Sequence, residues 1–155
     1  MIDLDGGARE LVIAVVRMRE AGFDFALVGG LAVMLRLAEA HRVTLDLDGV
    51  FDNISDTPTT EQLVLAGVAT DDDAPQRVLV AGTKVDVIDT HELPADLEAF
   101  PDGAKDRLFV CAHRYAFDTA EPLLVSAEDQ TTEVAVATVP AIVATKAHAL
   151  RFATN

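Results

Sequence analysis

Three aspartates in two separate segments could together hold a divalent cation. Between Val43 and Val50 the residues alternate in polarity, which is typical of a strand with one buried face. Asp46 and Asp48 would share the polar face with Thr44 and would repel each other. A cation between them would remove that cost, and oxygen ligands suit Mg²⁺ or Mn²⁺. A solvated outer face of the sheet explains the same pattern.

The third aspartate, Asp86, lies between Val85 and Val87 in another expected strand. Its side chain would point away from the face that these apolar neighbours bury. Beside Asp46 and Asp48 it would complete a set of three carboxylates, an arrangement that commonly supports phosphoryl transfer through bound metal. A carboxylate on an edge strand would look the same in the sequence.

Two glycines, Gly29 and Gly30, lie between the apolar run Phe25–Val28 and a segment of helical composition, Leu31–Ala40. At such a junction the backbone can approach a ligand closely, and the free N–H groups of the helix can bind phosphate. A plain turn is the alternative.

The elements that would position these residues alternate along the chain. Helices are expected at Leu4–Glu20, Leu31–Ala40, Thr59–Val68 (with Thr59 and Gln62 as a capping box), Lys105–Thr119 and Ala141–Phe152, the last with Pro140 in its first turn. Strands are expected at Phe25–Val28, Val43–Val50, Val78–Ala81, Lys84–Ile88, Pro122–Val125 and Glu133–Val139. Gly82-Thr83 is expected to form a hairpin turn, and Asp71-Asp72-Asp73 a loop. This order predicts an α/β (α+β) fold with a small mixed sheet flanked by helices.

Composition narrows the class of protein. The 155 residues carry 12 Lys+Arg and 26 Asp+Glu, a net charge of −14, which disfavours a protein that coats nucleic acid nonspecifically. No apolar run approaches the roughly 20 residues that span a bilayer, and the acidic N-terminus lacks the basic start of a secretory signal. One cysteine, Cys111, excludes an intramolecular disulfide. We expect a single domain over residues 1–155, cytoplasmic and without a membrane partner.

The order of the motifs resembles that of the nucleotidyltransferase superfamily. Val28-Gly29-Gly30 is followed by Asp46-Leu47-Asp48 and later by Val85-Asp86-Val87. The superfamily pattern is a hydrophobic residue before Gly-Gly or Gly-Ser, then Asp-x-Asp, then a third Asp between hydrophobic residues.

A narrower resemblance covers the chain from about Phe25 to its end. Gly29-Gly30-Leu31-Ala32, the segment from Arg42 to Asp48, and Lys146-Ala147-His148-Ala149-Leu150 resemble the AbiEii/AbiGii-type toxin nucleotidyltransferases of bacterial toxin–antitoxin and phage-defence systems. The resemblance implies transfer of a nucleoside monophosphate from an NTP to an acceptor hydroxyl, with RNA such as tRNA as acceptor and a cognate antitoxin as partner.

The resemblance also implies a division of roles around the nucleotide. Gly29 and Gly30 would cradle the triphosphate, Thr44 would lie beside the phosphates, and Lys146 would contact the nucleotide. Arg42 could contact phosphate or pair with an acid. Lys146 could equally be a surface lysine whose stem covers apolar neighbours.

The acidic residues would supply the metal ligands and the base. By the resemblance, Asp46 and Asp48 would hold Mg²⁺ or Mn²⁺, and Asp86 would be the third acid, positioned to activate the acceptor hydroxyl.

Two departures from the family qualify the choice of acceptor. Family members usually continue beyond the segment that Lys146 begins, so we expect this chain to lack a C-terminal part that contacts nucleotide or RNA. The charge of −14 suits a tRNA acceptor poorly. The alternatives are a nucleotidyltransferase that modifies a small cationic, aminoglycoside-like molecule and a non-catalytic nucleotide- or partner-binding module of the same fold.

Overall fold

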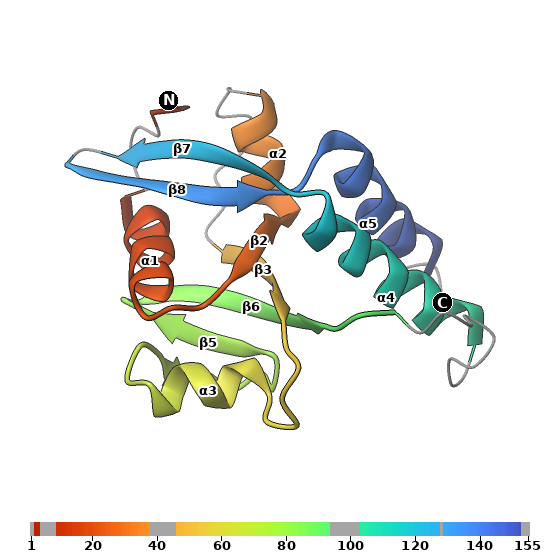
Figure 1. Cartoon of the computed structure of the whole chain (residues 1–155), viewed down its shortest axis with the longest axis horizontal. Helices are drawn as coiled ribbons and strands as arrows, with labels where there is room; N and C mark the ends of the chain where they lie inside the picture. Colours follow the sequence, from red (N-terminus) through yellow and green to blue (C-terminus); the bar gives the residue numbers. More distant parts are fainter. Residues whose placement is uncertain (1, 4–8, 38–45, 94–102, 128, 153–155) are drawn as a thin grey trace.

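The computed structural model describes residues 2–3, 9–37, 46–93, 103–127 and 129–152 (Figure 1). Its helices are α1 (Arg9–Glu20), α2 (Gly29–Leu37), α3 (Thr59–Leu65), α4 (Gly103–Asp118) and α5 (Val139–Phe152). Its strands are β1 (Ile2–Asp3), β2 (Phe25–Val28), β3 (Asp46–Asp52), β4 (Thr70–Asp71), β5 (Arg77–Val80), β6 (Thr83–Thr90), β7 (Glu121–Ala127) and β8 (Gln130–Val136).

The strands of the described part of the chain form one mixed sheet in the order β1-β7-β8-β2-β3-β6-β5-β4. β3 lies between β2, which is antiparallel to it, and β6, which is parallel to it. The expected α/β (α+β) fold is therefore confirmed. Each expected helix and strand has a counterpart: β2 has the expected bounds, and the others differ at one end or both. Residues 4–8, 38–40 and 43–45 of three expected elements lie outside the described residues. The two-residue strands β1 and β4 are additional.

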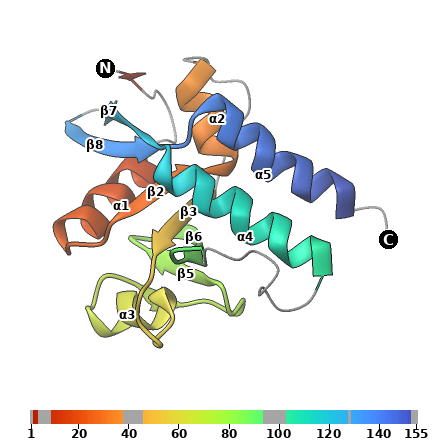
Figure 2. The same ribbon diagram turned by 45° about the vertical axis from the view of Figure 1, so that its right-hand side comes forward.

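Helices cover both faces of the sheet. α1 contacts β7 and β8, whereas α4 contacts β2, β3 and β6 and packs along α5. Figure 2 shows α4 and α5 side by side, on the other side of β2 and β3 from α1. The two faces of β3 therefore lie in different surroundings. Its polar face is on the side of α4, because Asp52 of β3 accepts from Arg114 of α4 at 2.9 Å and shares a face with Asp48.

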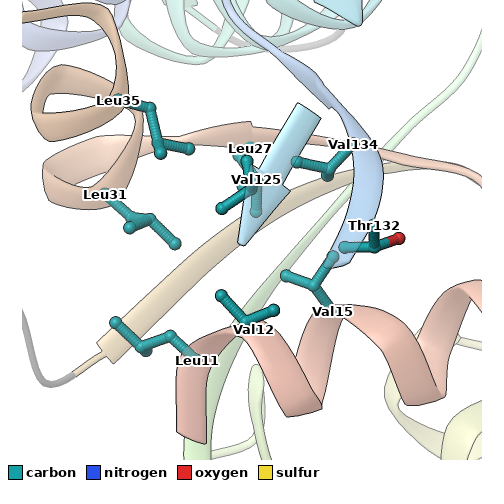
Figure 3. A pocket seen from close by; sticks show the side chains of 9 residues that line it. All are labelled: Leu11, Val12, Val15, Leu27, Leu31, Leu35, Val125, Thr132 and Val134. Atoms are coloured by element: carbon teal, nitrogen blue, oxygen red, sulfur yellow. The ribbon is translucent and has the colours of Figure 1, made fainter. Parts of the chain in front are cut away.

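Apolar side chains fill the space between α1 and the sheet. In Figure 3, Val12 and Val15 of α1 face Leu27 of β2 and Val134 of β8. The gap that remains among them is about 10 Å³, roughly the space for one water molecule. The gap among these described side chains is too small for a ligand.

Arg36 ties α2 to the centre of the sheet. Its guanidinium donates to the carbonyl oxygens of Val136 at 2.6 Å and Ala137 at 2.9 Å, and it pairs with Glu121 at 2.8 Å. Because these carbonyls end β8 beside β2, the contacts fix the direction in which α2 leaves β2.

The hairpin of β5 and β6 turns one residue earlier than expected. The turn residues are Ala81 and Gly82, with φ of 52° and 82°, and Thr83 is already in β6. Two positive φ angles are typical of a type I′ turn, whose twist matches that of the flanking strands. Gly82-Thr83 was therefore the wrong turn.

Two local expectations near α3 were also wrong. Thr59 does not cap α3: Pro58 is the N-cap residue, and the Thr59 N–H donates to Asp89 Oδ2 at 3.1 Å. Gln62 instead donates to the Thr57 carbonyl at 2.7 Å. Asp71 belongs to β4, because Thr70–Asp71 pairs with β5, and so only part of the predicted acidic loop is a loop.

The core on the α1 side generates a stability prediction. Phe51 is 2% exposed, and its ring stacks on Phe25 with centroids 5.1 Å apart. Phe51→Ala should lower the free energy of unfolding in urea by about 3–5 kcal/mol, because it removes buried area and leaves a cavity. Ile54→Ala, at a position 92% exposed, is the control and should change it by less than about 0.5 kcal/mol. Equal losses in the two variants would contradict this packing.

Candidate active site at the β2–α2 junction

Strand register brings the predicted acids onto one face of the sheet. Asp48 pairs with Val28 of β2 on one side and with Asp86 of β6 on the other. Asp46 is two residues before Asp48 in β3 and lies opposite Lys84. Since paired residues in neighbouring strands share a face, Asp46, Asp48 and Asp86 face the same side.

The junction of β2 and α2 lies directly against Asp48. Gly29 has a φ of 65°, and a Cβ built on it would lie 1.9 Å from Asp48 Oδ2. The N–H of Gly30 donates to the Asp48 carboxylate. Asp48 therefore binds one of the free N–H groups at the N-terminus of α2, where negative charge is stabilised.

The surroundings of Asp48 are unfavourable for its charge overall. Burial raises the pKa of Asp48, and the negative charges of Asp86 and Asp46 raise it further. Lys146 and the Gly30 N–H act in the opposite direction without cancelling the effect. A cation at this carboxylate would relieve the imbalance.

Arg77 is the important residue that the sequence analysis missed. It lies opposite Asp86 in the β5–β6 ladder, and its Nε and Nη2 donate to the two carboxylate oxygens of Asp86 at 2.6 and 2.8 Å. Both side chains are about three-quarters buried. This bidentate pair raises the pKa of Arg77, and Asp46 and Asp72 add to the effect.

The other predicted nucleotide-binding residues are only partly placed by the structure. Lys146 lies on α5 with an exposed side chain, within electrostatic range of Asp48. Arg42 and Thr44 lie outside the described residues. The structure thus brings together Gly29, Gly30 and the three acids, with Lys146 nearby.

The three acids fit a divalent cation unequally. Asp46 and Asp48 offer carboxylate oxygens on one strand face, the ligand type that Mg²⁺ and Mn²⁺ prefer. Asp86 faces the same side, but both its oxygens are bonded to Arg77. Within the described residues, no group of three or more His, Cys, Asp or Glu side chains is arranged to hold a metal ion. A three-acid site would require Asp86 to leave Arg77.

Comparison with protein-family models, with curated proteins and with solved structures gives no match for this chain. Among the helices of the described segments, none has the length and apolar character needed to cross a membrane.

The contact between Gly29 and Asp48 predicts an unusually costly substitution. Gly29→Ala places a methyl group on the carboxylate and adds the strain of a positive φ. Gly67 is the matched control, because its φ is 70° and no heavy atom lies within 4 Å of a Cβ built there. Gly67→Ala should cost about 1 kcal/mol in the free energy of unfolding, and Gly29→Ala about 2 kcal/mol more. Equal costs would show that Asp48 does not lie against the junction.

The raised pKa of Asp48 predicts a pH-dependent gain in stability on neutralisation. The folded protein holds the Asp48 proton more tightly than the unfolded chain does, so wild-type stability falls as the pH rises from about 4 through the raised pKa. Asp48→Asn removes this loss and can still accept the Gly30 N–H. It should raise the free energy of unfolding at pH 8 and raise it less at pH 4, because the wild-type carboxyl loses its proton only above its raised pKa. Asp56→Asn, at an exposed position, is the control and should show no such dependence on pH. An Asp48→Asn protein that is less stable than wild type at pH 8 would refute the conclusion that the surroundings of Asp48 disfavour its charge.

Proposed function

We propose that the chain is a metal-dependent nucleotidyltransferase, which transfers a nucleoside monophosphate from an NTP to an acceptor hydroxyl and releases pyrophosphate. The observation that carries the proposal is the meeting of the α2 N-terminus with Asp48, on a sheet face that also holds Asp46 and Asp86. Helix N-termini bind phosphate, and carboxylates bind the metal ions that accompany triphosphates.

In this proposal each group has a distinct task. The Gly29 N–H would bind triphosphate oxygens, and the Gly30 N–H would join it once Asp48 turns to the metal. Lys146 contributes positive charge from α5. Mg²⁺ or Mn²⁺ held by Asp46 and Asp48 would neutralise the charge of the triphosphate. Asp86, once free of Arg77, would bind the metal through one carboxylate oxygen and accept the proton of the acceptor hydroxyl with the other. The acceptor oxygen then bonds to the α-phosphorus as the bond to the pyrophosphate oxygen breaks.

The motifs and the net charge favour different acceptors. The motifs suggest RNA, tRNA in particular, and a toxin that a cognate antitoxin restrains. The net charge of −14 favours a second candidate, a small cationic acceptor of the aminoglycoside type, because an acidic surface attracts cations and repels RNA.

The bidentate Arg77–Asp86 pair favours one further candidate, a module that binds nucleotide without transferring it. Such a module would not need a free Asp86 carboxylate. Transfer activity itself separates this candidate from the two enzymes.

The proposal predicts that Asp46→Asn abolishes transfer without unfolding the protein. The protein would be incubated with each α-labelled NTP, Mg²⁺ and either total RNA or an aminoglycoside, and label on the acceptor would be measured. Loss of one metal ligand should reduce transfer at least about 100-fold. Asp56→Asn, at an exposed carboxylate outside the three motifs, is the control and should retain full transfer.

Two results would contradict the proposal. An Asp46→Asn protein with wild-type transfer would remove the metal assignment. A wild-type protein that binds NTP but labels no acceptor would favour the binding module.

A further inference from the structure

We infer that Arg77 is an internal counter-ion that competes with divalent metal for Asp86, so that the acidic site is closed at rest and opens when a cation displaces the guanidinium. This inference rests on the proposed function, because it concerns the metal that function requires.

The geometry of the pair supports competition. Arg77 Nε and Nη2 bond to Oδ1 and Oδ2 of Asp86, so the guanidinium occupies both carboxylate oxygens that a metal would use. The two side chains are 25% and 22% exposed, which limits the access of water to the pair. A metal and Arg77 therefore cannot both bind these oxygens in the same way.

The register of β5 and β6 places Arg77 beside Asp86. Arg77 begins β5 directly opposite Asp86, and Asp86 lies directly opposite Asp48 on the next strand. A row across the sheet thus leads from the N-terminus of α2 to Asp48, then to Asp86, and ends at the guanidinium of Arg77. Arg77 balances Asp86, whereas Asp48 keeps an unbalanced charge.

Arg77 also has acidic neighbours besides Asp86. Asp72, in the loop between β4 and β5, acts electrostatically on Arg77, as does Asp46. When Arg77 leaves Asp86, the negative charge of Asp72 still acts on the guanidinium.

The test is Mn²⁺ binding to the full chain without nucleotide, measured from the electron paramagnetic resonance signal of free Mn²⁺. Arg77→Gln should bind Mn²⁺ about tenfold more tightly than wild type, because the competitor is gone. Arg77→Lys should fall between the two, because an ammonium cannot occupy both oxygens in the same fork geometry. Arg19→Gln is the control: it removes the same charge from an exposed pair with Asp24 and should leave the affinity unchanged.

A second variant identifies the contested oxygens. In an Asp86→Asn background, Arg77→Gln should no longer tighten Mn²⁺ binding. Thermal unfolding of each variant checks that it is folded. If the Arg77→Gln protein is unfolded, the affinity of the Arg77→Lys protein is compared with that of wild type instead.

Each remaining outcome is decisive. Equal affinity in wild type, Arg77→Lys and Arg77→Gln would overturn the competition and leave the proposed function standing. Weaker binding in Arg77→Gln would show that Arg77 supports the site. No Mn²⁺ binding by wild type or any Arg77 variant at millimolar concentration would overturn both the competition and the proposed metal-dependent function.

Discussion

The close contact between Gly29 and Asp48 constrains the whole acidic end of the sheet. A side chain at position 29 is costly, because its Cβ would overlap the Asp48 carboxylate and the backbone φ there is positive. Because position 29 is a glycine, Asp48 can accept a hydrogen bond from the Gly30 N–H. α2 also begins directly after β2, with no intervening loop. Arg36 holds α2 to the end of β8, so the direction of the helix is fixed at a second point. The N-terminal end of α2 and a carboxylate are thus held together by backbone geometry.

Charge balance then differs among the three acids. Arg77 neutralises Asp86, whereas Asp48 is half-buried beside other acids and has its pKa raised. A surface acid of a chain with net charge −14 would merely be solvated, but these acids are held in a row by strand register. The arrangement stores electrostatic repulsion that cation binding would relieve. That is why we assign the metal to Asp46 and Asp48 first and to Asp86 only after Arg77 is displaced.

The features that could be predicted from the sequence are the local ones. The apolar run of β2, the glycines that follow it and the alternation of β3 depend on neighbouring residues alone, and these gave Asp46, Asp48 and the junction. Arg77 was missed because its partner depends on register: a turn at Gly82-Thr83 would place Leu79 opposite Asp86, whereas the actual turn at Ala81-Gly82 places Arg77 there. The pairing of β3 with β6 and of β2 with β8 joins distant segments, and no short pattern specifies it.

The central claim is that a divalent cation binds at the β2–α2 junction and not diffusely on an acidic surface. The most direct measurement is paramagnetic broadening of amide NMR signals as Mn²⁺ is added in substoichiometric amounts. The account predicts that Gly29, Gly30 and the amides around Asp48 broaden first, followed by those around Asp86. Broadening that begins at Asp71-Asp72-Asp73, or that spreads evenly over the exposed carboxylates, would contradict it.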